Sequence, residues 1–386
     1  MQLVQNLVDT AQGVFNSPAL AAAAWGMAVS FALCVLLVIT KRWHGVLTMD
    51  SINGIQKFHT QPTPRVGGIP IVLGVAAAWG HLSQDMHEIL TPILLAGMPA
   101  FLFGVAEDIT KRVGVMQRLL ATMASGLLAW WLTGYSITHV DVWGVNWLLS
   151  FTLVSVLFTA FAVGGVANAI NIIDGFNGLA SSASTLAFMG YAMIAWQVGD
   201  SALAGAALVL AACVWGFFWV NWPLGKIFLG DGGSYFIGFS LAWAAVMLIE
   251  RNPGVSAFAA LLVCVHPVTE VLFSIYRRKI KKANPGYADR LHFHSLIKQR
   301  YVRRWFPHLS SDLRNSLTGA LVGCMTLTAI VVANLTFASV WLSIAAFMVL
   351  SMGYVAIYGR MVRYRWCSPI EFLLVKPAVQ SIATSR

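Results

Sequence analysis

Four polar side chains recur at every third position between two long apolar segments of the chain. They belong to Asn168, Asn171, Asp174 and Asn177. In hydrocarbon such side chains are costly unless they face partners, water or a ligand. The residue types and their spacing therefore indicate a site for a cation or a nucleotide at a membrane surface. The alternative is an ordinary polar loop between two helices.

Two adjacent carboxylates, Glu107 and Asp108, end another apolar segment. Neighbouring residues on a helix point about 100° apart, so one carboxylate would face a site while the other supports it. Such a pair suits a general base or a metal-linked carboxylate. The alternative is a pair of surface acids neutralised by Lys111 and Arg112.

A third acid, Asp231, lies in the stretch Gly-Asp-Gly-Gly-Ser that begins a further apolar segment. The N-terminus of a helix favours anions, because its first backbone N–H groups have no partner within the helix. A carboxylate offers the hard oxygen that Mg²⁺ prefers. Together these features fit a metal-bound diphosphate.

Two polar segments supply donors for phosphate oxygens. Lys57, Thr63 and Arg65 precede a Gly-Gly pair, where a purely structural turn is the alternative. The sequence Arg290-Leu-His292-Phe-His294 offers three more donors. Its alternate histidines would suit Zn²⁺ only with a further close Cys or His, which is missing, so we favour an anionic substrate.

The elements that must position these residues are membrane helices. Of the 386 residues, 58% are hydrophobic and 10% are charged, against about 25% charged in soluble domains. Apolar runs near the spanning length of about 17–25 residues predict eleven transmembrane helices in an all-α, single polytopic membrane domain covering 1–386. The runs lie at about 18–40, 67–82, 89–107, 117–134, 147–168, 178–198, 202–221, 232–249, 255–276, 315–334 and 337–358.

The distribution of charge gives an independent test of this count. With eleven spans, 24 of the 25 Lys and Arg fall on one side, and only Arg251 lies opposite. Cytoplasmic loops carry the excess of Lys and Arg, which predicts an external N-terminus and a cytoplasmic C-terminus. Attraction to anionic lipid explains part of this basic face but not the acids gathered on it. The polar motifs fall on cytoplasmic loops at about 41–66, 107–118, 168–179, 221–234 and 277–314.

Taken together, these motifs resemble a known family. Asn168–Leu179, the Glu107-Asp108 pair, Phe228-Leu-Gly-Asp231-Gly-Gly-Ser and Arg290-Leu-His-Phe-His294 occur in the order found in polyprenyl-phosphate N-acetylhexosamine-1-phosphate transferases, glycosyltransferase family 4, the relatives of translocase I. The segment Pro62–Gly68 fits as well, and the resemblance covers about residues 40–300. The eleven spans match the branch that starts O-antigen or similar glycan lipids.

The resemblance implies roles for individual residues. Asp108 and Glu107 match the acidic pair that activates or orients the acceptor phosphate, and Asn171 and Asp231 match the positions that hold Mg²⁺, for which Mn²⁺ is a possible substitute. The role of Asp174 stays open: it either holds the shape of the loop or takes part in catalysis. We include it among the catalytic candidates.

The resemblance also implies a set of substrate-binding residues. Two match positions that recognise uracil and stack on it, and three match the loop that grips the diphosphate and sugar. They are Asn177, Phe228, Arg290, His292 and His294.

Two departures from the family pattern affect the assignments. The acidic pair is often Asp-Asp, and the longer Glu107 changes the reach of its first member. A Lys is usual near position 117, where this chain has Gln117 followed by Arg118. Arg118 or Lys111 would supply the missing positive charge, and we place Arg118 with the substrate-binding residues.

The expected activity is Mg²⁺-dependent transfer of an N-acetylhexosamine 1-phosphate from a UDP-sugar to undecaprenyl phosphate, releasing UMP, in the bacterial inner membrane. The expected partners are a UDP-N-acetylhexosamine, undecaprenyl phosphate and the lipid bilayer, with no nucleic acid. A homodimer is one of the assemblies that the sequence leaves open. One alternative is translocase I acting on UDP-MurNAc-pentapeptide, although the histidine loop lacks its run of consecutive histidines. Another is a transporter of lipid or nucleotide sugar, although the sequence shows no internal repeat.

Overall fold

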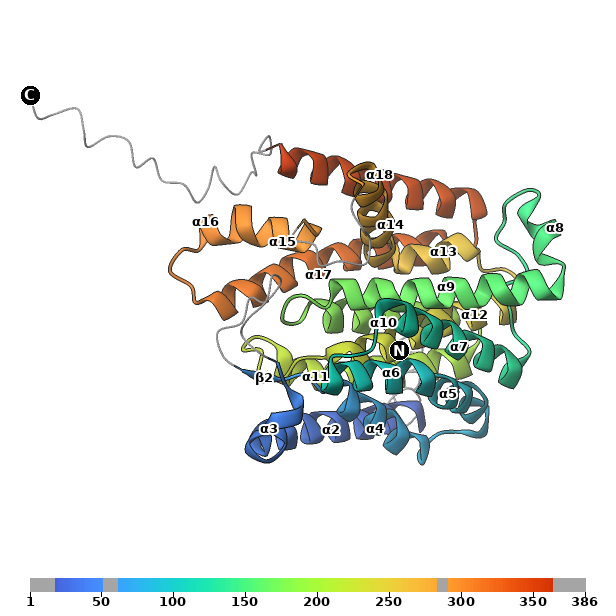
Figure 1. The fold of residues 1–386 in the computed structure, drawn as a ribbon. Coiled ribbons are helices and arrows are strands. Elements are labelled where there is room, and N and C mark those ends of the chain that lie inside the picture. The colour runs from blue at the N-terminus through green and yellow to red at the C-terminus, as the bar shows by residue number, and fades with distance from the viewer. Residues whose placement is uncertain (1–17, 51–61, 283–290, 364–386) are drawn as a thin grey trace, which may run out of the picture.

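A computed structural model describes residues 18–50, 62–282 and 291–363 as a bundle of helices (Figure 1). The first half contains α2 (Pro18–Ile39), α3 (Lys41–Thr48), α4 (Gly68–Trp79), α5 (Gln84–Ala96), α6 (Met98–Thr110), α7 (Val115–Thr133), α8 (Val145–Leu149) and α9 (Thr152–Ile173). The second half contains α10 (Leu179–Gln197), α11 (Ser201–Asn221), α12 (Gly230–Arg251), α13 (Ala257–Val263), α14 (Val265–Ile280), α15 (Phe293–Ile297), the π-helix η1 (Lys298–Val302), α16 (Arg303–Trp305), α17 (Ser311–Thr336) and α18 (Val340–Val362).

The structure confirms the class of all-α, multi-pass membrane protein. In the described residues, eight helices are long and apolar enough to cross a membrane, with α5 and α6 counted as one. A ninth is present if α13 and α14, which bend by 85° at their junction, form a single span. Each of the eleven predicted segments contains a helix, but α4 has only 12 residues and α7 is not among the eight. The number of crossings and the placement of the termini therefore stay predictions.

Helix α12 is the centre of the bundle, with α4, α6 and α9 packed around it (Figure 1). In its most apolar window 94% of the residues are buried, against 28% in α2 and 11% in α18. Glycines allow its neighbours to approach closely. A Cβ atom on Gly68 of α4 would lie 2.3 Å from the backbone nitrogen of Gly233, and one on Gly104 of α6 would lie 2.5 Å from that of Gly232.

A short extended segment before α4 is hydrogen-bonded to the residues before α12. Strands β1 (Met49–Asp50) and β2 (Thr63–Pro64) pair antiparallel, with Asp50 opposite Thr63. The chain then runs beside the residues before α12. The backbone N–H of Phe228 donates to the oxygen of Pro64 at 2.8 Å, and that of Gly67 donates back to Phe228 at 2.9 Å. These hydrogen bonds hold Arg65 next to the first turn of α12.

The other end of α12 is fixed by Arg251, the single basic residue that the charge pattern placed on the outer side. Its Nε donates to Asp200 Oδ2 at 2.7 Å and its Nη2 donates to Oδ1 at 3.0 Å. Asp200 also caps α11 by accepting from the backbone N–H of Leu203. The pair therefore ties the end of α12 to the start of α11.

Candidate active site

Helix ends bring five of the predicted residues together around the first turn of α12. Asp231 lies in that turn, Asp108 in the last turn of α6, Arg118 in the first turn of α7 and Asn171 in the last turn of α9. Arg65 reaches the cluster from the segment after β2. The five residues span a long stretch of the sequence, since Arg65 and Asp231 are 166 positions apart.

Asp108 is buried, with 3% exposure, and both of its oxygens are occupied. Oδ1 accepts the backbone N–H of Asp231 and Oδ2 accepts that of Gly232, each at 2.9 Å. Arg65 Nε lies 3.2 Å from Oδ1. A carboxylate at this position satisfies N–H groups that the helix itself leaves unpaired. Asp108 therefore acts as a cap that fixes the start of α12.

Asp231 is held by two guanidinium groups. Arg65 Nη2 lies 2.5 Å from Oδ1, and Arg118 Nη1 contacts Oδ2. Asn171 Nδ2 donates to the same Oδ1 at 3.1 Å. Asp231 is 2% exposed, and two positive charges thus surround its carboxylate. Their sum equals the charge of one divalent cation.

The ligands that this cluster offers fit Mg²⁺, which keeps water and phosphate ligands, better than a metal that is enclosed entirely by protein side chains. In the described part of the chain no three His, Cys, Asp or Glu residues lie close enough to enclose an ion. Mg²⁺ is usually held by one or two carboxylates and completes its shell with water and phosphate oxygens. Asp231 and the carboxamide oxygen of Asn171 are the groups that would hold it, and that oxygen now accepts from Tyr235 at 3.3 Å.

Asp174 follows the end of α9 and faces the same cluster. The pKa of its carboxyl is raised to about 7, and burial is the largest cause. The charge of Arg65 lowers this pKa, and the charges of Asp231 and Asp108 raise it. Within the described residues its carboxyl makes no side-chain hydrogen bond. Such a group holds or releases a proton near neutral pH, which is the property that acid–base chemistry needs.

Two predicted residues have local roles instead. Glu107 Oε2 accepts the backbone N–H of Val113 at 2.8 Å, so it stabilises the turn between α6 and α7. Asn168 Nδ2 donates to the oxygen of Gly164 at 2.8 Å, one turn earlier in its own helix. The pattern of one polar residue in three therefore does not form a single polar face.

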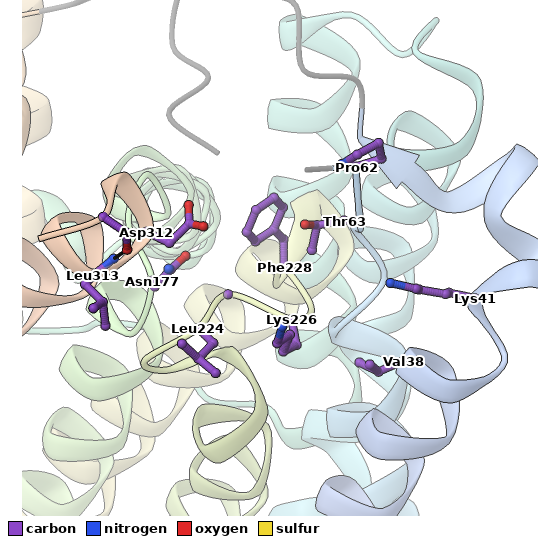
Figure 2. A pocket seen from close by; sticks show the side chains of 12 residues that line it. Val38, Lys41, Pro62, Thr63, Asn177, Leu224, Lys226, Phe228, Asp312 and Leu313 are labelled. Carbon is purple, nitrogen blue, oxygen red and sulfur yellow. Dashed lines mark hydrogen bonds between the residues drawn. The ribbon is translucent and has the colours of Figure 1, made fainter. Parts of the chain in front are cut away.

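A pocket of about 190 Å³ is lined in part by residues that lie two or three positions before Arg65 and Asp231 in the chain (Figure 2). Three residues predicted to bind substrate line it, and three charged residues that the sequence analysis did not single out join them. The pocket is lined by Thr63, Asn177 and Phe228 and by Lys41, Lys226 and Asp312. Its volume is below the range of about 300–1,000 Å³ for pockets that hold whole drug-sized ligands, so it suits one part of a nucleotide, such as the base.

Asn221 joins the two loops that form the pocket and the acidic cluster. Its Oδ1 accepts the backbone N–H of Gly178 at 2.6 Å, and its Nδ2 donates to the oxygen of Ile227 at 2.8 Å. The side chain is buried. One carboxamide therefore sets the spacing between the segment that carries Asn177 and the segment that carries Phe228. One signal in the sequence indicates this role, since Asn221 begins the predicted loop 221–234.

The two predicted histidines border the loop after α9. His294 is buried with its ring edge-on to Phe176, at 5.2 Å between centroids. His292 Nδ1 lies 3.0 Å from Oε1 of the buried Glu270, which also accepts the backbone N–H of Phe293 at 3.1 Å. Glu270 therefore orients the histidine segment. Two other predicted residues, Lys57 and Arg290, lie outside the described residues.

The chain is similar to known proteins over most of its length. The sequence profile of glycosyl transferase family 4 matches residues 90–249, which include both acidic motifs and the loop after α9. An undecaprenyl-phosphate alpha-N-acetylglucosaminyl 1-phosphate transferase of Yersinia pestis is 25% identical over 87% of this chain and 90% of its own. The protein of the same name from Thermotoga maritima is 28% identical, over 73% of this chain and 82% of its own.

A probable undecaprenyl-phosphate N-acetylglucosaminyl 1-phosphate transferase of Bacillus subtilis is 26% identical over 75% of this chain and 78% of its own. The profile and these relatives agree with the motifs and with the cluster of acids, amides and arginines at the start of α12. Over residues 90–249 the chain therefore resembles glycosyl transferase family 4, and the relatives named above carry the names of sugar 1-phosphate transferases.

Proposed function

We propose that this enzyme transfers an N-acetylhexosamine 1-phosphate from a UDP-sugar to undecaprenyl phosphate, releasing UMP and starting a lipid-linked glycan of the O-antigen type in the bacterial inner membrane. The observation that carries the proposal is that the two short segments ending in Arg65 and Asp231 also supply Thr63 and Phe228 to a base-sized pocket. Phe228 lines that pocket and precedes Asp231 by three residues in the chain. The names of the relatives support the acceptor and the N-acetylglucosamine type of donor.

In the proposed reaction an oxygen of the lipid phosphate attacks the phosphorus next to the sugar. The bond from that phosphorus to the bridging oxygen breaks, and UMP takes the electron pair. Mg²⁺ held by Asp231 and Asn171 would neutralise charge on the diphosphate and on the leaving UMP. The acceptor phosphate is largely ionised at neutral pH, since its second pKa is near 6, so little proton removal is needed.

The arrangement of the side chains supports a division of tasks. Arg65 and Arg118 supply positive charge where the phosphates would lie. Asp174 is one group whose carboxyl can exchange a proton near neutral pH. Asp108 acts by positioning, because both of its oxygens already accept backbone N–H groups. Phe228 and Asn177 both line the base pocket (Figure 2). His294 borders the loop that would carry the sugar phosphate, through its contact with Phe176.

The test is UMP release by the purified protein in detergent, with undecaprenyl phosphate and one UDP-sugar at a time. UDP-GlcNAc, UDP-GalNAc and UDP-MurNAc-pentapeptide separate the branches of the family. We expect release that requires Mg²⁺ or Mn²⁺ and is lost in Asp231→Ala. A transporter would form no lipid-linked sugar in detergent, so the absence of product with every donor would refute the proposal.

A further inference from the structure

Ser316 on α17 lies behind the pocket wall and contacts three polar groups. Its Oγ donates to the oxygen of Pro223 and lies 3.0 Å from the oxygen of Asp312, while Asn177 Nδ2 lies 3.2 Å away. Ser316 and Asn177 are both buried, at 2% and 6% exposure. The hydroxyl has one proton, and both backbone oxygens can only accept. The proton therefore points to a backbone oxygen, and only lone pairs face Asn177.

This network decides which way the carboxamide of Asn177 is turned. An oxygen facing the lone pairs of Ser316 would meet repulsion, so the NH₂ group of Asn177 must face Ser316. Gly225 leaves space for the carboxamide itself, because a Cβ atom there would lie 2.8 Å from both Asn177 Nδ2 and Asn177 Oδ1. Among the residues that the structure describes, Oδ1 accepts no hydrogen bond. Asn177 therefore presents an acceptor to the pocket.

We propose that Ser316 is a specificity-determining residue that sets the choice of nucleobase through Asn177. This inference rests on the proposed function. With its oxygen turned to the pocket, Asn177 accepts a ring N–H, which uracil carries at N3. Cytosine carries a lone pair at N3, so two acceptors would face each other. We expect a preference for uridine of about fivefold to 150-fold, which corresponds to the cost of about 1–3 kcal/mol for an unpaired buried polar group.

A substitution at Ser316 separates this role from simple packing. In Ser316→Ala the carboxamide of Asn177 is free to turn over, and its NH₂ group can then donate to N3 of cytosine. A carboxylate at position 177 has two equivalent oxygens, so turning it over changes nothing. The loss of Ser316 should therefore alter base preference when Asn177 is present and leave it unaltered in the Asn177→Asp background.

The experiment measures the dissociation constants of UMP and CMP by calorimetry on the full-length protein in detergent with Mg²⁺, so no turnover is required. We expect wild type to bind UMP more tightly than CMP. In Ser316→Ala the ratio of the CMP to the UMP dissociation constant should fall about tenfold. Ser316→Cys, which fills nearly the same space with a weakly hydrogen-bonding thiol, should show the same fall. The matched control is Thr318→Ala, which removes a buried hydroxyl that bonds only within α17.

The outcomes separate the inference from the proposed function. Equal UMP preference in wild type, Ser316→Ala and Ser316→Cys would overturn the role of Ser316 while leaving the uridine donor intact. A fall in preference that also occurs when Ser316→Ala is added to Asn177→Asp would show general damage to the pocket and would equally overturn it. Wild type that binds neither nucleotide would refute the proposed donor, and the inference with it.

Discussion

The substitution Asp108→Asn tests whether this acid positions the site or removes a proton. An asparagine keeps the shape but offers one acceptor oxygen where the structure uses two. Its NH₂ group would then face the backbone N–H of Asp231 or of Gly232, each of which now donates at 2.9 Å. A hydrogen bond to a charged group contributes about 1.5–3 kcal/mol, and a buried unpaired N–H costs about 1–3 kcal/mol. We therefore expect a loss of roughly 3–5 kcal/mol at the start of α12.

The same change should reduce turnover by displacing Asp231. A misplacement of about 1 Å can cost about a hundredfold in rate, so we expect a fall in kcat of that order. The assay is UMP release between pH 5.5 and 9, together with thermal unfolding of the protein without Mg²⁺. The positioning role predicts a lower Tm and a residual rate with the same pH dependence as wild type. Glu107→Gln is the control, because its side-chain oxygen can still accept from Val113.

One combination of results would refute this reasoning. If Asp108→Asn unfolds at the wild-type temperature while the rise of activity with pH disappears, then Asp108 accepts a proton and its hydrogen bonds to α12 contribute little. A general base titrates in the pH–rate profile, whereas a cap does not.

Three further predictions follow from the same geometry. The pKa of Asp174 rises from 3.8 to about 7 on folding, so the folded protein binds the proton more tightly and its stability falls as pH rises through that interval. Asp174→Asn should therefore stabilise metal-free protein by up to roughly 4 kcal/mol at pH 8 and by less at pH 5, seen as a larger rise in Tm at pH 8. An equal rise in Tm at both pH values would contradict the assignment. Arg118→Gln removes one of the two cations on Asp231, so substrate-free protein should bind Mg²⁺ about tenfold more tightly by calorimetry, and unchanged affinity would count against the competition. Gly68→Ala places a methyl group 2.3 Å from the backbone of α12 and should lower the free energy of unfolding by about 1–3 kcal/mol. The control is Gly80→Ala, whose methyl group would have its nearest contact 3.9 Å away and should have little effect. Equal Tm values for the two variants in thermal unfolding would refute the close packing.

The sequence predicted the class of fold and most members of the site, because both depend on residue type. Apolar runs identify membrane helices, and an acid or amide at the end of such a run is costly without a partner. Asp108, Asn171 and Asp231 were found in this way and do lie together. The break at Gly97 and the 85° bend at Cys264 were not foreseen, since an interrupted helix is as apolar as a continuous one.

The three-residue period was a poorer guide than the residue types. Each step of three on a helix falls about 60° short of a full turn, so Asn168 and Asn171 point in different directions. Accordingly, Asn168 bonds within α9 and Asn171 bonds to Asp231. Asp174 and Asn177 come after the helix ends at Ile173, where the period has no geometric meaning.

The role of Asp108 and the pocket residues depended on contacts that no local pattern contains. Asp108 and the N–H groups it accepts are more than 120 positions apart. Lys41 and Asp312 reach the pocket from opposite ends of the chain, and Ser316 contacts the pocket residue Asn177 from behind. A sequence motif can indicate that a carboxylate is needed, but only the packing of helices shows which donors surround it.

The glycine contacts around α12 have a consequence for how two unlike substrates meet. Backbones that touch without side chains between them cannot slide or rotate without a collision, so α12 and the carboxylate on its first turn form a fixed reference point. In the proposed reaction one substrate diffuses in water and the other in a two-dimensional sheet of lipid. An anchored Asp231 would hold the reacting phosphorus at one depth, and the lipid phosphate would reach it by lateral diffusion alone.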